Sequence, residues 1–140
     1  MVLVIMISRV TIEVVKPKEM RYRTVGDWFY SADPTFLVIQ IADTGNWKYN
    51  FLVGVHELVE VLLCTNDGVT AKQVDRFDLA HQDDEDQDPG THPKAPYHKQ
   101  HLIAMGVEML LAAFLGVKWR VYENTLDKIY FKIPKRKKPL

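Results

Sequence analysis

The first third of the chain shows the two-residue period of β-strands. In residues 2–15 (VLVIMISRVTIEVV) β-branched side chains dominate, and from Arg9 onward polar and apolar side chains alternate. This alternation is typical of a strand with one buried face. Residues 24–30 and 35–43 are two further strand candidates, and the second of them is bounded by the turn-forming segments SADP and DTGN. The pattern predicts a small N-terminal β-sheet.

At Trp47 the period changes to that of a helix. From Trp47 to Cys64 apolar side chains recur every three or four residues, which predicts a long amphipathic helix. Thr44 or Asn46 can cap its first turn, and the segment TNDG at residues 65–68 can end it. The apolar stripe consists of Leu52, Val55, Val59 and Leu62.

The second half of the chain carries two more helical patterns and a polar loop. A short helix is expected from Thr70, where Gln73 completes a capping box. Residues 81–95 are acidic and contain prolines, which predicts an exposed loop, and residues 96–115 should form a second long helix. In residues 126–134 apolar and basic side chains alternate, which favours a last strand or an extended arm.

These elements predict one α+β domain over residues 1–133, in which a small N-terminal sheet packs on two long helices. Residues 134–140 (PKRKKPL) should form a basic flexible tail. The 18 basic and 18 acidic residues of the 140 cancel, so no overall field indicates a nucleic-acid or membrane partner. The apolar start MVLVIMIS is shorter than the ~20 residues that span a bilayer, and it lacks the features of a signal peptide. The single cysteine, Cys64, fits a reducing, cytoplasmic setting.

Both long helices carry polar groups on otherwise apolar faces. In the segment HELVE, His56 and Glu60 lie one turn apart on one side of the first helix, and Glu57 borders that side. On the second helix, two imidazoles and a carboxylate share a face at a spacing of three, four and three residues: His98, His101, Met105 and Glu108. If the two helices pack antiparallel, these groups meet.

A metal ion is the economical explanation for such a set. His56 and Glu60 would supply two ligands, and His101 or His98 from the second helix would supply the third, which leaves a fourth position for water. Glu57 would then accept a proton from that water as a general base. Zinc is the first candidate, and the carboxylate ligand also suits manganese or iron.

Simpler roles exist for the same residues. A histidine on a buried helix can be a core residue, and a glutamate four residues later can be its ion-pair partner. Cys64 is expected to serve as a small buried apolar residue. His81 and His92, within the acidic loop, are expected to be solvated.

The segment IQIADTGNWKYNFLVGVHELVE resembles the minimal core of the zincin metalloproteases, in which a strand precedes a helix carrying His-Glu-x-x-His. His56 matches the first zinc ligand of that motif and Glu57 matches its general base, while Glu60 replaces the second histidine. The resemblance implies a metal-dependent hydrolase acting on a peptide. It also implies that residues 36–41 form the strand edge along which that peptide pairs.

A second resemblance is to the MazG-like nucleotide pyrophosphohydrolases, which hold magnesium with Glu-x-x-Glu and Glu-x-x-Asp pairs. Glu57 and Glu60 match the first pair, and Asp75 and Asp78 could stand for the second. The histidines and the N-terminal strands have no place in that family's pattern. The chain as a whole also resembles small proteins of tailed bacteriophages whose activity is unknown, which suggests a bacterial cytoplasm as the setting.

A non-enzymatic interaction protein is the competing class. In that case the polar helix faces would be internal ion pairs or a binding surface. Aromatic side chains would then contact the partner or fill the core: Trp28, Phe29, Tyr30, Trp119 and Tyr122.

Overall fold

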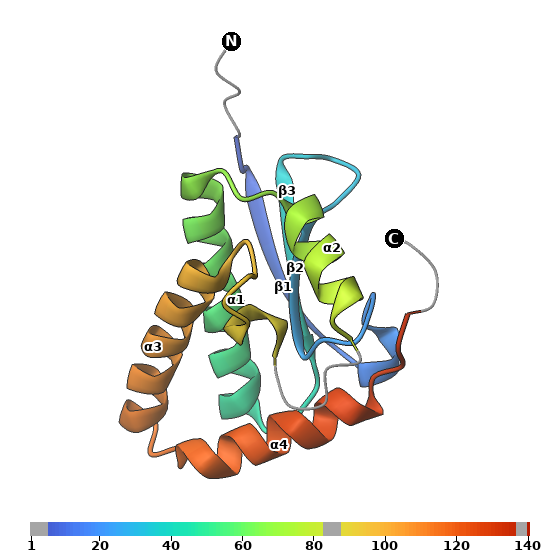
Figure 1. The fold of residues 1–140 in the computed structure, drawn as a ribbon. Helices are drawn as coiled ribbons and strands as arrows, with labels where there is room; N and C mark the ends of the chain where they lie inside the picture. Colours follow the sequence, from blue (N-terminus) through green and yellow to red (C-terminus); the bar gives the residue numbers. More distant parts are fainter. Residues whose placement is uncertain (1–5, 83–87, 137–139) are drawn as a thin grey trace.

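The computed structural model describes residues 6–82, 88–136 and 140, so the centre of the predicted acidic loop and part of the basic tail lie outside the described residues. Three strands come first: β1 (Arg9–Val15), β2 (Gly26–Tyr30) and β3 (Phe36–Ala42). Four helices follow (Figure 1): α1 (Trp47–Asp67), α2 (Ala71–Ala80), α3 (His98–Phe114) and α4 (Trp119–Lys132). Two short 3₁₀ turns, η1 (Pro17–Glu19) and η2 (Pro89–Thr91), complete the order. The predicted α+β class and the N-terminal sheet are confirmed.

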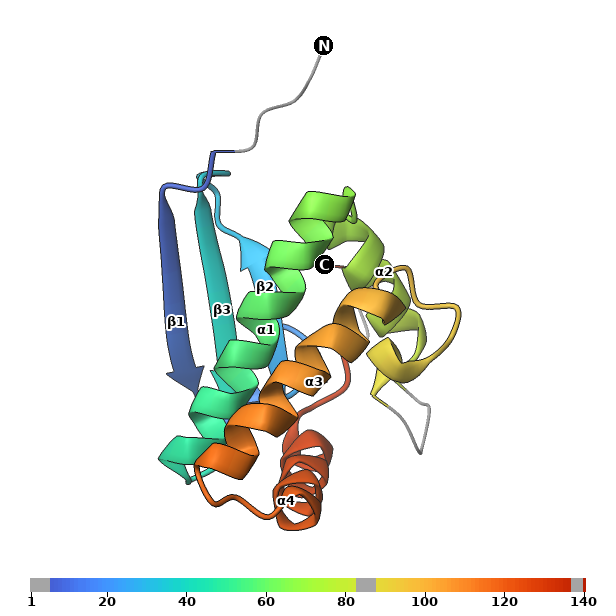
Figure 2. The same cartoon turned by 90° about the vertical axis from the view of Figure 1, so that its left-hand side faces the viewer.

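The sheet has the order β1-β3-β2, with β1 parallel and β2 antiparallel to β3. Figure 2 shows the three strands side by side with α1 in front of them. Because β3 pairs on both sides, the expectation that residues 36–41 offer a free edge to a peptide is wrong. β3 is instead the centre of the sheet, and its alternate side chains Leu37, Ile39 and Ile41 are almost fully buried.

Helix α1 lies between the sheet and α3. It begins where the Asn46 side chain accepts hydrogen bonds from the Lys48 and Tyr49 amides, and it ends at Gly68, which has a φ of 75°. One side of α1 packs on β2 and β3, and the opposite side packs on α3. Gly54 permits a close approach to the sheet, since a Cβ there would lie 3.0 Å from Cδ1 of Ile41. This position between the sheet and α3 brings the polar residues of α1 into contact with both.

The C-terminal segment differs from its prediction. Residues 126–134 were expected to form a strand or an arm, but most of them belong to helix α4, and only Ile133 and Pro134 follow it. Tyr122, Ile129 and Ile133 are spaced for one side of a helix and are buried against the rest of the molecule. Ile129 and Ile133 belong to this buried side of the helix, whereas Phe131, which completed the apparent alternation, is exposed.

The segment around α2 and the following loop is packed where it is described. Thr70 and Gln73 form the predicted capping box at the start of α2. Gln82, Gly90 and Ala95, which fall in the predicted exposed loop, are all buried. The loop therefore contributes to the interior next to α3.

Candidate metal centre

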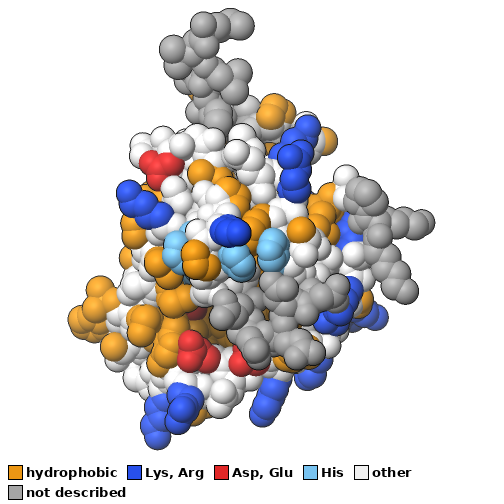
Figure 3. Space-filling view, in the orientation of Figure 1, with side chains coloured by type: hydrophobic (Ala, Val, Ile, Leu, Met, Phe, Trp, Pro, Cys, Tyr) orange, Lys and Arg blue, Asp and Glu red, His pale blue; other side chains and the backbone are white. Residues whose placement is uncertain are grey.

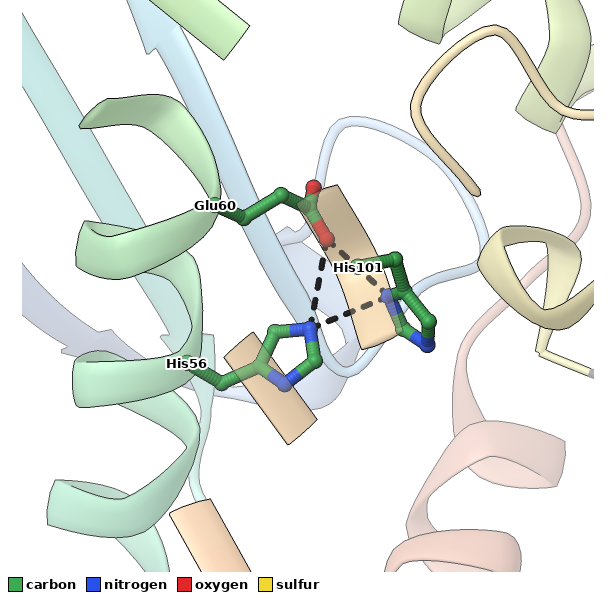
Figure 4. Close-up of side chains that lie close together, drawn as sticks. All are labelled: His56, Glu60 and His101. Carbon is green, nitrogen blue, oxygen red and sulfur yellow. Dashed lines mark hydrogen bonds and ion pairs between the residues drawn. The ribbon is translucent and has the colours of Figure 1, made fainter. Parts of the chain in front are cut away.

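Three buried side chains converge between α1 and α3. His56 and Glu60 come from adjacent turns of α1, and His101 comes from α3 (Figure 4). Nε2 of His56 lies 3.2 Å from Oε2 of Glu60 and 3.1 Å from Nδ1 of His101. The third side of this triangle, from Nδ1 of His101 to Oε2 of Glu60, is 3.0 Å. The three residues are between 2% and 7% exposed, so only a small part of the triangle is in contact with bulk water.

The size of this triangle fits a tetrahedral metal ion. Zinc bonds of about 2.0–2.1 Å to nitrogen and oxygen place two ligand atoms of a tetrahedron roughly 3.3 Å apart. The observed separations of 3.0–3.2 Å are slightly shorter. An ion could therefore sit above the three atoms with only a small outward movement of the side chains. All three groups offer the donor atoms that zinc prefers.

Outer partners orient each of the three side chains. Nδ1 of His56 lies 2.7 Å from Oε1 of Glu108, and the hydroxyl of Tyr122 donates to the other oxygen of Glu108. Since the carboxylate accepts the Nδ1 proton, Nε2 of a neutral His56 keeps its lone pair and directs it into the triangle. The indole of Trp28 donates to Oε1 of Glu60 over 3.1 Å.

His101 has a comparable outer partner. Its Nε2 lies 3.3 Å from Oδ2 of Asp88, a charge contact outside hydrogen-bond angles. A proton on Nε2 leaves Nδ1 free to face the triangle. Pairs of a ligating histidine and an outer carboxylate are the usual support of a protein metal site. Both histidines here have one.

The three ligand atoms of the triangle would repel one another if neither a proton nor a cation lay between them. Two imidazole lone pairs and one carboxylate oxygen face each other at hydrogen-bond distance, so either protons or a cation must sit between them. Burial alone would lower the pKa of both histidines, but Glu108 and Glu60 raise the pKa of His56 well above 6.5. The charge of Asp88 and the hydrogen bond to Glu60 likewise raise the pKa of His101. Burial would raise the pKa of Glu60, but hydrogen bonds and charge from both histidines lower it to about 2.

Glu57 lies in the same interior without a hydrogen-bond partner among the described residues. Its carboxyl group packs over Gly26, where a Cβ would come within 2.6 Å of Oε1. Burial, followed by the charge of Glu60, raises the pKa of Glu57 well above 4.5, although His56 opposes this. A buried carboxyl group with a raised pKa that lines a cavity is a candidate for general acid–base chemistry.

A cavity of about 510 Å³ adjoins the triangle. His56, Glu57, Glu60 and His101 all line it, together with aromatic side chains from β2, from the segments just before β2 and α3, and from α4. This volume lies in the range of small-molecule sites. The triangle is thus reachable by a ligand on the side that faces the cavity.

The fourth predicted ligand, His98, does not join the triangle. Its Nδ1 lies 3.0 Å from the carbonyl oxygen of Gly90, in turn η2. Gly90 in turn packs against the ring of His101, where a Cβ would overlap the imidazole. His98 therefore holds the loop that presses on His101.

Sequence reasoning assigned no role beside the triangle to three of its partners: Trp28, Asp88 and Glu108. Glu108 carried a signal, because it shares the predicted polar face of α3 with His101. Trp28 lies on a strand distant in sequence and Asp88 in an irregular loop, so no periodicity could connect them with α1.

Asp75 and Asp78, which would form the second carboxylate pair of a MazG-like magnesium site, already have protein partners. Asp75 pairs with Arg21 over 3.0 Å. Asp78 accepts hydrogen bonds from the hydroxyls of Tyr22 and Tyr97. These contacts, with the histidines beside Glu60, disfavour a four-carboxylate magnesium site.

The other residues considered as candidates, Cys64, His81 and His92, pack against neighbouring side chains away from the triangle. Cys64 is fully buried in the apolar cluster beneath α1, and burial raises the pKa of its thiol to about 12. His81 is stacked on Phe77 and only partly exposed, and His92 packs against both rings. Figure 3 shows histidines grouped near the centre of the surface in that view.

No protein-family model, curated protein or solved structure matches the chain. Within the described residues, every helix is too short or too polar to cross a membrane.

Proposed function

We propose that the protein binds one transition-metal ion, with zinc as the first candidate, through His56, Glu60 and His101. The observation that carries this proposal is the triangle of three potential ligand atoms 3.0–3.2 Å apart. Ion pairing alone does not require two imidazoles to face one carboxylate oxygen with an outer carboxylate beside each imidazole. Manganese or iron remains compatible with the same ligands.

The chemistry that fits this centre is hydrolysis. Three protein ligands with an open fourth position are typical of catalytic zinc sites, whereas structural sites use four. A metal at this position would lower the pKa of a bound water and polarise a carbonyl group. Glu57, which is buried and lines the same cavity, would accept the proton of that water. A small amide or ester is the proposed substrate class, and a peptide remains within it. We further infer a cytoplasmic setting, in a bacterial host if the chain is phage-encoded, from the single cysteine.

Elemental analysis of untagged protein tests the metal centre directly. We expect about one zinc, iron or manganese per chain in the wild type, and loss of that metal in His56→Ala and His101→Ala. His98→Ala should keep its metal because His98 contacts Gly90 rather than the triangle. His81→Ala, outside the cavity lining, is the matched control. A wild type that takes up no metal after supplementation would make HELVE an internal ion-pair cluster and would favour a non-enzymatic interaction protein.

A Glu57→Gln variant separates chemistry from metal binding. It should retain the metal and lose hydrolysis of p-nitrophenyl esters and fluorogenic peptides by at least about a hundredfold, the usual contribution of a general base. Full activity with full metal content would exclude Glu57 as the base.

A further inference from the structure

One side of the molecule carries an exposed apolar surface that crosses three neighbouring elements. We call it the apolar face. It consists of Val10, Ile12 and Val14 of β1, Phe51, Leu58 and Leu62 of α1, and Ile103, Leu110 and Phe114 of α3. These side chains are between 39% and 84% exposed. Figure 2 looks onto this side, with β1, α1 and α3 following one another across the view.

The β1 part of the apolar face is a strand surface without a helix over most of it. Ile12 points toward α1, since a Cβ on Gly54 would lie 3.6 Å from its Cγ2, and Val10 and Val14 share that side by strand alternation. Because α1 packs over β2 and β3 instead, all three β1 side chains stay about half exposed. A sheet surface of this kind is normally covered by a helix.

The α3 part of the apolar face is the reverse case: it is an apolar helix ridge that packs on no other described element. This ridge consists of Ile103, Leu110 and Phe114, which are spaced by seven and four residues and so lie on one side of the helix. Their side chains point away from the molecule. Figure 1 shows that α3 stands further from the sheet than α1 does. The apolar face therefore rises in steps from β1 through α1 to α3.

A stepped surface with these two ends is complementary to a copy of itself. A twofold rotation about the middle of α1 places α3 of one copy over β1 of the other, and places the two α1 stripes against each other. The high end of each copy then fills the low end of its partner. Among the described residues, the exposed side chains of α1 from Tyr49 to Leu62 and of α3 from Leu102 to Phe114 include no Asp, Glu, Lys or Arg to oppose this contact.

The area is sufficient for a stable dimer. The nine side chains expose on the order of 900 Å² together, against the roughly 800 Å² that each partner buries in a standard interface. The largest apolar patch on a typical monomer is only about 300–600 Å². We propose that the protein is a twofold homodimer joined through the apolar face, with the metal centre of each copy on the inner side of α1.

Sedimentation of the intact, metal-loaded protein tests the dimer. We expect twice the mass of the chain for the wild type. Leu62→Glu or Phe114→Glu should weaken dimerisation roughly tenfold to a thousandfold, because each places a charge in the apolar contact between the copies. Both positions are at least 66% exposed, so the fold should remain intact, which circular dichroism checks. Val121→Glu, at a half-exposed position of α4 outside the apolar face, is the matched control and should stay dimeric.

Cross-linking tests the geometry of the dimer. Under mild oxidation, a Leu58→Cys variant should form a disulfide between the two copies near the twofold axis, and a Val121→Cys variant should not. Cys64 is fully buried and does not interfere. A monomeric wild type, a dimer unaffected by both glutamate substitutions, or cross-linking only through Val121→Cys would each overturn the proposal. A monomer that binds lipid vesicles through these residues would also overturn it, in favour of a membrane surface.

Discussion

Gly90 packs directly against the ring of His101. A side chain at residue 90 would overlap the His101 ring. The backbone of Gly90 does not require glycine, because φ is positive only at Gly45, Gly68 and Gly116 among the described glycines. Gly90→Ala should therefore shift the imidazole and lower zinc affinity roughly tenfold to a hundredfold, as loss of an outer contact usually does. Competition with a chromophoric chelator measures the change.

Gly106→Ala is the matched control for that substitution. Gly106 lies in the same helix as His101, and a Cβ there meets no atom within 4 Å. Alanine should leave zinc affinity unchanged and raise the free energy of unfolding by about 0.5–1 kcal/mol, because it replaces glycine within a helix. If Gly90→Ala also leaves the affinity unchanged, the loop rather than His101 gives way.

At the residue scale, the sequence predicted what helical spacing alone can predict. His56 and Glu60 lie one turn apart, and His101 stands on the polar face of the next helix, so their meeting required only that α1 and α3 pack together. His98 shares that face but lies one turn nearer the start of the helix, where its Nδ1 contacts the carbonyl oxygen of Gly90. The choice between the two histidines depended on a loop contact that no periodicity encodes.

At the element scale, Asp78 ties α2 to two other segments. The hydroxyls of Tyr22, before β2, and of Tyr97, before α3, both donate to it. Burial raises the pKa of Asp78 well above 3.8, although these two hydrogen bonds oppose the shift. In the folded protein the carboxyl group therefore holds its proton to a higher pH than in the unfolded chain.

The sign of the pH dependence follows from that difference. Below about pH 4 both states are protonated, and above it the unfolded chain loses the Asp78 proton first, so stability falls as pH rises. Chelator-treated wild type should lose up to about 1.4 kcal/mol per pH unit more than Asp78→Asn in this window. Urea denaturation between pH 4 and pH 7 measures both. Parallel stability curves for the two proteins would show that folding does not raise the pKa of Asp78.

The elements that were predicted less well are those whose pattern is ambiguous over a short stretch. The alternation at residues 126–134 fitted a strand, yet Tyr122 and Ile129 fitted a helix over a longer window, and the longer pattern decided the structure. The order of strands was beyond sequence reasoning for another reason. β1 and β3 pair in parallel although β2 lies between them in the chain, so pairing partners could not be inferred from succession.

At the scale of the whole molecule, the proposed metal couples to folding because its ligands come from two helices. An ion that binds only the folded chain stabilises it by about 2.7 kcal/mol when its free concentration is a hundred times the dissociation constant. We expect zinc to raise the free energy of unfolding of the wild type by this amount, and chelation to reverse the gain. Urea denaturation with and without zinc measures it.

The control for this coupling is His101→Ala, which keeps both α1 ligands but removes the contribution of α3. Zinc should stabilise this variant little, because two ligands on one helix bind weakly and hold no second element. The comparison must be made at a fixed chain concentration, since a dimer is also stabilised by mass action. Equal stabilisation of wild type and His101→Ala would mean that zinc binds outside the triangle. A zinc effect that vanishes in His101→Ala but persists in Leu62→Glu would show that the metal joins α1 to α3 independently of the contact between copies.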